Sequence, residues 1–478
     1  MVYVILIGYI AIVFLGSLRG AKKDVTTPEG YFLANRNLGT LALFFTILAT
    51  NFSAFYFLGF AGAGYRIGYS HYVVMAFGTG FACLSFFLLG TKIWRLGKQK
   101  GYITPAELIR DQTGSLILAY LYSGIMLLFT FPYLALQIIG SGYILEAITQ
   151  GQVPYFLGAT LLTLFTIGYV WIGGMKSVAK TDLKQGMLAI TLMLAAVMVI
   201  GNSLGGLTLA NEKIFEIQPE LFFREGMGNA YPPQKWFSML IFWMFCIPMF
   251  PQIFMRFYIA KNLPTLKKSA LLYGLIPLFI SILPVIIGVL GHLTFPDLMS
   301  LEPELMKKET DQILPKMLLE HSPEWFAALV MTGALAAFMS TLDSQLLALS
   351  TMVTRDFILP YRKKIDLRQQ VFIGRIWVVI IAFIGLAIAA QPFTTIFDMG
   401  KLAFSGLAIL FPVTLMILRG GGVNPKFGIA SILVGVLLLL GFYYKIISSE
   451  WLFGFESPII VLAVSFLIVL LGKLVPNK

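Results

Sequence analysis

The chain has little charge and almost no cysteine. Of its 478 residues only 12% are charged and 58% are hydrophobic, whereas a soluble domain carries about a quarter charged residues. The scarcity of charge excludes an ordinary soluble domain. The two cysteines, Cys83 and Cys246, lie in separate apolar runs and imply no disulfide framework. The sequence has no GxxxxGK[ST] phosphate-binding loop, which argues against an ATP-driven pump.

Long apolar runs recur from end to end, and the mean hydropathy is +0.84. A run of about 18 apolar residues is long enough to cross a bilayer as a helix. The pattern predicts an all-α polytopic membrane protein with about thirteen transmembrane helices. The predicted spans are 2–18, 41–66, 70–91, 115–146, 155–173, 184–204, 236–258, 268–292, 324–354, 369–390, 394–418, 424–445 and 453–472.

The net charge of +12 is concentrated in every second loop. With these spans, 26 of the 35 Lys and Arg lie on one side and the other 9 on the opposite side. Basic loops face the cytoplasm. We therefore expect a multi-pass plasma-membrane protein with its N-terminus outside and its C-terminus in the cytoplasm. The basic side chains mark the inner membrane face rather than a nucleic-acid partner, and the sequence leaves the oligomeric state open.

Three spans carry polar residues or signals of a break. Transporters need polar groups at the membrane midplane and often supply them by breaking a helix there. The second span reads ATNFSAFYFLGFAGAGYRIGY, where Asn51 and Ser53 predict an unwound segment and the later glycines predict close helix packing. In the seventh span, Pro248 and Pro251 predict a break or a kink.

The ninth span contains a polar cluster, Ser340, Thr341, Asp343 and Ser344. An ionisable side chain inside a span is costly and usually has a function. The hydroxyl groups have a simpler alternative role, since each can bond the carbonyl four residues earlier. The two predicted breaks and this polar cluster make the second, seventh and ninth spans the first places to look for a binding site.

The segment between the fifth and sixth spans reads GGMKSVAKTDLKQG, residues 173–186. It resembles the signature of the sodium:solute symporter family, with Gly173, Gly174, Ser177, Thr181, Asp182 and Gln185 at the matching positions. Three other stretches resemble the same family: STLDSQLLALST at 340–351, PQIFMRF at 251–257, and ITPAELIRD at 103–111. The nearest motifs are those of the sodium/proline and monocarboxylate branches.

The resemblance implies a LeuT-type inverted repeat of five plus five helices in one transporter domain. The repeats fall at 41–204 and 236–418, after a first span and loop at 1–40. Two extra spans occupy 424–478. The resemblance also implies Na⁺ as the coupling ion. Carried over residue by residue, the sodium ligands are the backbone oxygens of Ala49, Phe52 and Ala337 with the side chains of Ser340 and Thr341.

Some family members bind a second sodium ion nearer the cytoplasm. This resemblance assigns Asp182, Asp343 and Ser344 to a second sodium site or to the sodium exit route. From the residues alone, Thr181 and Asp182 have another interpretation, because both can cap the start of the sixth span. A lysine of the same loop then pairs with Asp182.

The predicted substrate pocket is more apolar and aromatic than a sugar site. Its candidate residues are Asn51, Ser53, Tyr56, Tyr72, Tyr133, Gln137, Trp243 and Pro251. Plain helix packing is the alternative role of the aromatic side chains. Amides freed at a broken helix, together with a helix N-terminus, can hold a small carboxylate.

We therefore expect a symporter that couples sodium entry to import of an amino acid or a monocarboxylate by alternating access. The alternatives are a proton-coupled symporter using Asp182 or Asp343, a transporter of a sugar or other solute, and a solute-sensing membrane protein. Sensors of this kind usually carry a fused cytoplasmic domain, and this sequence ends six residues after its last predicted span. An enzyme is disfavoured because Asp343 has no obvious catalytic partner in the sequence.

Overall fold

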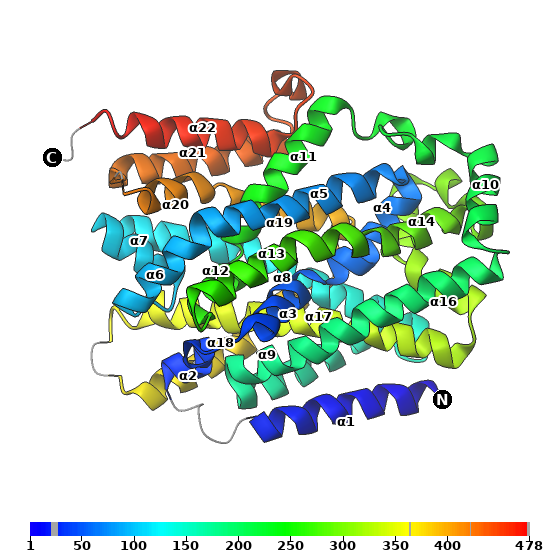
Figure 1. Cartoon of the computed structure of the whole chain (residues 1–478), viewed down its shortest axis with the longest axis horizontal. Coiled ribbons are helices and arrows are strands. Elements are labelled where there is room, and N and C mark those ends of the chain that lie inside the picture. The colour runs from blue at the N-terminus through cyan, green and yellow to red at the C-terminus, as the bar shows by residue number, and fades with distance from the viewer. Residues whose placement is uncertain (21–26, 363–364, 421, 476–478) are drawn as a thin grey trace.

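The structure is a computed structural model that describes residues 1–20, 27–362, 365–420 and 422–475. Five lysines of the charge pattern, Lys22, Lys23, Lys363, Lys364 and Lys478, lie outside the described residues. The described part is helical and contains no strand, apart from a single bridge between Leu38 and Ala260. Most of the long helices run along the longest axis of the molecule, and the two chain ends lie at opposite ends of that axis (Figure 1).

The first third of the chain forms eight helices, two of which belong to one broken span. The helices are α1 (Val2–Gly20), α2 (Pro28–Leu33), α3 (Thr40–Asn51), α4 (Phe60–Ile67), α5 (Ser70–Ser85), α6 (Thr91–Lys100), α7 (Pro105–Thr113) and α8 (Leu116–Ile148). Helices α3 and α4 are the two halves of the second predicted span, joined through the π-turn Phe55–Gly59 and bent by 55°. The predicted interruption at Asn51 and Ser53 is confirmed.

Helix α9 (Tyr155–Ser203) folds back on itself at Gly174. Gly174 has φ 56° and ψ −164°, a conformation that only glycine adopts readily. Phe165 and Gln185 both reach Tyr9 of α1, Phe165 across a small cavity and Gln185 by a hydrogen bond. In a straight helix these two residues lie about 30 Å apart. The two halves of α9 are therefore the fifth and sixth predicted spans.

The reversal at Gly174 corrects one interpretation of this segment. The helix resumes at once after Gly174, so Thr181 and Asp182 lie inside the second half rather than at its start. The Thr181 hydroxyl donates to the carbonyls of Ser177 and Val178, as a side chain within a helix does. Asp182 is buried and points to other helices, so neither residue is a helix cap.

The middle of the chain contains the second broken span. Helices α10 (Leu207–Ile217), α11 (Pro233–Cys246), α12 (Pro251–Ile259), α13 (Leu263–Ile280) and α14 (Ile282–Thr294) follow in order. Between α11 and α12 the chain passes through the short 3-10 turn Ile247–Met249 and bends by 59°. The break predicted from Pro248 and Pro251 is confirmed.

The remaining helices surround one central helix. They are α15 (Pro303–Asp311), α16 (Ile313–His321), α17 (Glu324–Met352), α18 (Leu367–Ala389), α19 (Ile396–Ala408), α20 (Phe411–Leu418), α21 (Pro425–Tyr443) and α22 (Ser457–Leu471). Helix α17 is buried over nearly its whole length and is continuous to Met352. The polar cluster of the ninth predicted span therefore lies in an intact helix.

Among the described residues, eight helices are long and apolar enough to span a membrane, and the two bent pairs raise this number to ten. Two shorter apolar segments, Val2–Val13 and Ser457–Leu471, lie near the chain ends. Each of the thirteen predicted spans contains one of these helices, one bent pair or one half of α9. Helices α1 and α22 lie at opposite edges of the bundle (Figure 1).

The glycines of the second span pack against a neighbouring helix. A Cβ on Gly64 would lie 2.7 Å from the Val285 oxygen of α14, and one on Gly288 would lie 2.0 Å from the Ala61 oxygen. Only glycine allows the two backbones to approach this closely. The close-packing interpretation is confirmed for Gly64, where α4 meets α14.

Candidate functional site

The break between α3 and α4 is held by side chains of α8. The Ala54 N–H, which loses its helical acceptor at the break, donates to Gln137 Oε1 at 2.9 Å. The Tyr133 hydroxyl donates to the Thr50 carbonyl at 3.3 Å. Buried backbone groups need such partners. Gln137 and Tyr133 therefore stabilise the unwound segment.

Thr341 of α17 faces the end of α3. Its Oγ1 lies 3.2 Å from the Ala49 oxygen, 3.1 Å from the Thr50 oxygen and 3.3 Å from the Ala337 oxygen. Carbonyl and hydroxyl oxygens are the ligands that hard cations prefer. Three members of the predicted sodium set, Ala49, Ala337 and Thr341, therefore meet at one place.

Two members of the predicted set have other contacts, and one unpredicted oxygen lies close by. The Ser340 hydroxyl donates to Asp182 Oδ1 at 2.5 Å instead of joining the carbonyls. Phe52 caps α3, and its ring stacks on Tyr56 with centroids 4.5 Å apart. The Thr50 oxygen, which sequence reasoning missed, lies within hydrogen-bond distance of Thr341.

A second polar cluster lies beside this group of oxygens and contains two buried carboxylates. Asp182 accepts hydrogen bonds from Ser340 and from Thr46. Asp343 accepts from the Tyr169 hydroxyl at 2.5 Å and from the Ser344 hydroxyl at 3.1 Å. The predicted second-site residues Asp182, Asp343 and Ser344 therefore belong to one connected network.

Arg256 supplies the positive charge of this network. Its side chain and that of Asp182 are both 0% exposed, and Nη2 lies 3.5 Å from Asp182 Oδ2. The guanidinium also donates to Ser344 Oγ at 2.6 Å, to Thr46 Oγ1 at 3.1 Å and to the backbone carbonyl oxygen of Gln252 at 2.8 Å. A buried carboxylate needs such a partner or a bound cation.

Sequence reasoning missed Arg256, Thr46 and Tyr169 as members of the network. Arg256 was counted with the basic residues of the cytoplasmic face because charge counting treats every arginine near a span end alike. Its position within the apolar run 236–258, one turn after Pro251, was the available signal. Thr46 and Tyr169 carry no comparable signal, because a single hydroxyl in a helix is common.

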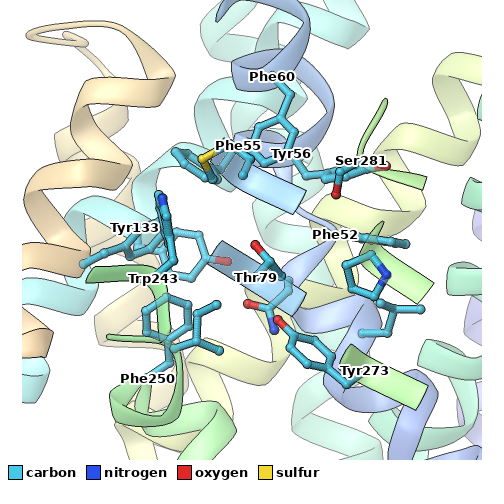
Figure 2. Close-up of a pocket in the computed structure, with 16 residues that line it drawn as sticks. Phe52, Phe55, Tyr56, Phe60, Thr79, Tyr133, Trp243, Phe250, Tyr273 and Ser281 are labelled. Atoms are coloured by element: carbon cyan, nitrogen blue, oxygen red, sulfur yellow. The ribbon is translucent and has the colours of Figure 1, made fainter. Parts of the chain in front are cut away.

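A narrow cavity lies between the two broken spans (Figure 2). It is lined by Leu48, Asn51, Phe52, Phe55, Tyr56, Phe60, Met75, Thr79, Tyr133, Trp243, Ile247, Phe250, Tyr273, Pro277, Ser281 and Phe404. Tyr133, Trp243 and Phe250 lie on one side of it, and Phe52 and Tyr273 on the other (Figure 2). Its free volume of about 40 Å³ holds only a few water molecules.

The lining includes four of the predicted substrate residues, Asn51, Tyr56, Tyr133 and Trp243. The other four lie around it. Tyr72 donates to the Leu278 oxygen, Gln137 holds the break, and Pro251 begins α12 next to the lining residue Phe250. The Ser53 hydroxyl is buried and has no hydrogen-bond partner among the described residues. The structure adds Thr79, Tyr273 and Ser281 as polar lining residues.

A model of the sodium:solute symporter family matches residues 31–435. The chain belongs to this family. The match includes both broken spans, the Asp182–Arg256 network and the cavity between the broken spans. The family resemblance stated from the sequence is therefore confirmed.

Curated family members are similar over most of the chain. A sodium/pantothenate symporter of Escherichia coli (strain K12) is 25% identical over 477 residues, covering 98% of this chain and 95% of that protein. An osmoregulated proline transporter of Bacillus subtilis (strain 168) is 25% identical, covering 90% and 86%. A human sodium/myo-inositol cotransporter 2 is also 25% identical, covering 80% of this chain and 60% of that protein.

Solved structures share the fold. A Na⁺-coupled sialic acid symporter in a substrate-bound outward-open state aligns with a TM-score of 0.80 at 17% identity, covering 100% of this chain and 98% of that one. Mhp1, a nucleobase-cation-symport-1 family transporter, aligns with a TM-score of 0.62 at 13% identity, covering 94% of both chains. The LeuT-type fold predicted from the sequence is confirmed.

As a member of the sodium:solute symporter family, the protein is a multi-pass membrane transporter that couples solute transport to Na⁺. It is a secondary transporter and not an enzyme. The oxygens around Thr341 and the buried carboxylates fit a sodium ion, since both sets are hard oxygen donors. Among the described residues, no group of three or more His, Cys, Asp or Glu is placed to hold a metal ion.

Proposed function

We propose that the protein imports a small monocarboxylate together with sodium. The rest of this substrate is a branched or otherwise apolar group that fits among aromatic side chains, and the substrate belongs to the chemical class of pantothenate. The observation that carries this proposal is the chemistry of the cavity between the two broken spans. Its lining is aromatic and aliphatic with a few neutral polar groups, and no charged side chain is among the lining residues described. Such a pocket selects an apolar body and fixes it by few hydrogen bonds.

Several buried polar groups at this cavity are without partners and are therefore available to a substrate. Trp243 Nε1 and the Tyr273 hydroxyl are both buried lining groups with no hydrogen bond among the described residues. Buried polar groups normally have partners. An indole N–H can donate to a carboxylate or carbonyl oxygen, and a phenol can bind a hydroxyl or an amide.

The start of α12 offers a binding position for the carboxylate. This helix begins directly after the lining residue Phe250, and Pro251 occupies its first position. The N–H groups of Gln252 and Ile253 therefore have no acceptor within the helix. The side-chain amide of Gln252 is buried with neither its nitrogen nor its oxygen bonded. A carboxylate is stabilised at such a helix start.

The sodium/pantothenate symporter of Escherichia coli, which aligns over 98% of this chain, supports this substrate class. The proline transporter of Bacillus subtilis supports the amino-acid alternative. An amino acid also needs acceptors for its ammonium group. In the described lining the side-chain oxygens available for that purpose are neutral.

We propose two positions for sodium in the same structure. One uses the oxygens of Ala49, Phe52, Ala337, Ser340 and Thr341, and needs the Ser340 hydroxyl to turn from Asp182. The other uses Asp182, Asp343 and Ser344 on the inner release route. We further propose that the N-terminus lies outside and the C-terminus in the cytoplasm, and that the repeats 41–204 and 236–418 alternate around the pocket.

The purified protein in proteoliposomes tests the proposal. Uptake of labelled pantothenate, proline, myo-inositol and a short monocarboxylate is measured with sodium outside, and again with choline under a pH gradient. We expect sodium-dependent uptake of pantothenate or the monocarboxylate and no uptake of inositol. Uptake of proline alone contradicts the substrate class, and uptake driven by the pH gradient without sodium moves the coupling role to a proton on Asp182 or Asp343.

A matched pair of variants locates the substrate. Tyr273→Phe removes an unpartnered hydroxyl inside the cavity, whereas Tyr72→Phe removes a hydroxyl bonded to the Leu278 oxygen outside its lining. We expect a KM raised several-fold in the first variant and a KM near the wild-type value in the second. Equal effects of the two variants contradict this assignment of the cavity.

A further inference from the structure

Helix α1 reaches the carboxylate network although it lies at the edge of the bundle (Figure 1). The family model begins at residue 31, after this helix. Helix α1 packs against α9 and α17, the two helices that carry Asp182 and Asp343. Its Tyr9 hydroxyl accepts a hydrogen bond from Gln185 Nε2 at 2.7 Å and points to Met339 Sδ at 3.8 Å. One side chain of α1 therefore joins both helices beside the network.

Gln185 lies on the same face of α9 as Asp182. The two residues are three positions apart in the second half of that helix, so their side chains are neighbours. Met339, the other partner of Tyr9, directly precedes Ser340, whose hydroxyl bonds Asp182. The contact between Tyr9 and Gln185 is thus one helical turn from the carboxylate that is proposed to bind sodium.

The two ends of the Gln185 amide differ in their partners. The nitrogen is bonded to Tyr9, while Oε1 is buried and has no hydrogen-bond partner among the described residues. The residue is only 3% exposed, so the unpaired oxygen is shielded from bulk water. A buried carbonyl oxygen without a donor is unfavourable and requires a ligand or an ordered water. Because Tyr9 holds the nitrogen, the oxygen points away from α1.

We propose that Gln185 Oε1 is a further oxygen ligand for the sodium ion on its inner route, and that Tyr9 is the positioning residue that orients it. A neutral amide oxygen is a ligand of the type that hard cations accept. This inference rests on the proposed passage of sodium past Asp182. It gives α1 a role in ion binding that the five-plus-five core does not supply.

Sodium binding to the purified full-length protein tests the inference without any knowledge of the substrate. Binding of ²²Na⁺ is measured by scintillation proximity over a range of sodium concentrations in wild type, Gln185→Leu and Tyr9→Phe. We expect the half-saturating sodium concentration to rise at least about threefold in Gln185→Leu. A smaller rise is expected in Tyr9→Phe, because the amide remains but loses its orientation. The double variant should resemble Gln185→Leu alone, since both changes act on the same oxygen.

Tyr3→Phe is the matched control. Tyr3 lies on the same helix and its hydroxyl also bonds a glutamine, Gln152, at 2.7 Å, but at the other end of α1. We expect its sodium binding to equal that of wild type. If Gln185→Leu fails to fold, which gel filtration in detergent shows, Tyr9→Phe decides the question. Unchanged sodium affinity in the folded variants overturns the inference, and so does an equal loss in Tyr3→Phe.

The outcomes separate this inference from the proposed function. Absence of saturable sodium binding in the wild type contradicts the sodium route itself. Normal wild-type binding with unaffected variants contradicts only the role of Gln185 and Tyr9. If the substrate is not a monocarboxylate, neither conclusion about sodium binding changes, because no substrate is present in the assay.

Discussion

Each broken span carries an arginine on its second half, and each arginine faces a buried aspartate. Arg66 of α4 lies 3.4 Å from Asp311 of α15, and Arg256 of α12 lies 3.5 Å from Asp182 of α9. The charge pattern assigns Arg66 and Asp311 to the outer side and Arg256 to the inner side. In the orientation proposed above, the two pairs lie on opposite faces of the transporter.

The surroundings of the two pairs differ. Asp311 also accepts the Ile396 N–H of α19 at 2.7 Å, so the outer pair ties three helices together through a backbone group. Around Asp182 the other donors are the hydroxyls of Thr46 and Ser340, which are oxygens that a cation can also use. We infer that the outer pair is a latch, whereas the inner pair is a place where sodium can replace or join a guanidinium.

Removing the inner charge should have the largest effect. Arg256→Met leaves two buried carboxylates without their cation, and breaking a buried ion pair in this way costs about 3–5 kcal/mol. We expect a large fall in melting temperature in choline buffer, with partial recovery in sodium because the ion replaces the guanidinium. Thermal unfolding followed in both buffers measures this effect.

Arg66→Met is the matched control for that experiment. The Arg66 side chain is 13% exposed, whereas the Arg256 and Asp182 side chains are both 0% exposed, so a smaller loss is expected. Sodium should not restore its stability. Sodium rescue of both variants, or of neither, contradicts the distinction between a latch and an ion site.

External pH should act on the outer pair. Burial raises the pKa of Asp311 from 3.8 to about 6, although nearby Arg66 lowers it. A group that holds its proton more tightly when buried stabilises the buried arrangement at low pH, and that stabilisation is lost as the pH rises through about 6. If opening exposes Asp311 to water, lowering the external pH from 7 to 5 favours the closed outer face by up to about tenfold.

We therefore expect sodium-driven uptake to slow at an external pH of 5, and the same titration with Asp311→Asn measures the cause. The amide cannot titrate, so the variant should lose most of this dependence. A pH profile in Asp311→Asn identical to that of wild type shows that another group is responsible.

Of these changes, replacing arginine by lysine should have the smallest effect on stability, and only at Arg66 on the outer side. Arg66 contacts Thr310 and Asp311 through a single nitrogen, Nη1. A lysine can replace one point contact, so Arg66→Lys should change stability by less than about 1 kcal/mol. Melting temperature and initial uptake rate are the two measurements.

Arg256→Lys is the contrast. Arg256 uses Nε, Nη1 and Nη2 to reach different acceptors, and an ammonium group cannot reproduce that planar arrangement. A clear loss of stability is expected. Equal tolerance of lysine at both positions contradicts the view that the inner guanidinium organises a network.

The fold was largely predictable because its signals are strong in a single sequence. Apolar runs of membrane length mark the spans, and Pro248, Pro251, Asn51 and Ser53 mark the two breaks. The backbone of a membrane helix has few other ways to be interrupted. The sequence did not show how the polar cluster of α17 acts, because serine and threonine can bond backward within an intact helix or across to other helices, and the sequence does not distinguish these outcomes.

The candidate site was predictable only where a motif fixed it. The sodium oxygens near Thr341 follow from the resemblance, and Asp182 with Asp343 follows from charge placed in apolar runs. The partner of Asp182 was not evident, because α9 and α12 meet only through the tertiary fold. The lining residues Thr79, Tyr273 and Ser281 lie on helices whose aromatic and polar residues look like ordinary packing positions.

Sodium-dependent uptake in a Ser340→Ala, Thr341→Ala double variant tests the central claim most directly. Ser350→Ala on the same helix is the control, because its buried hydroxyl bonds only the Leu347 oxygen among the described residues. Our account predicts that the double variant loses sodium-dependent uptake or needs at least about ten times more sodium, while Ser350→Ala behaves as wild type. A folded double variant with wild-type sodium dependence would contradict the account.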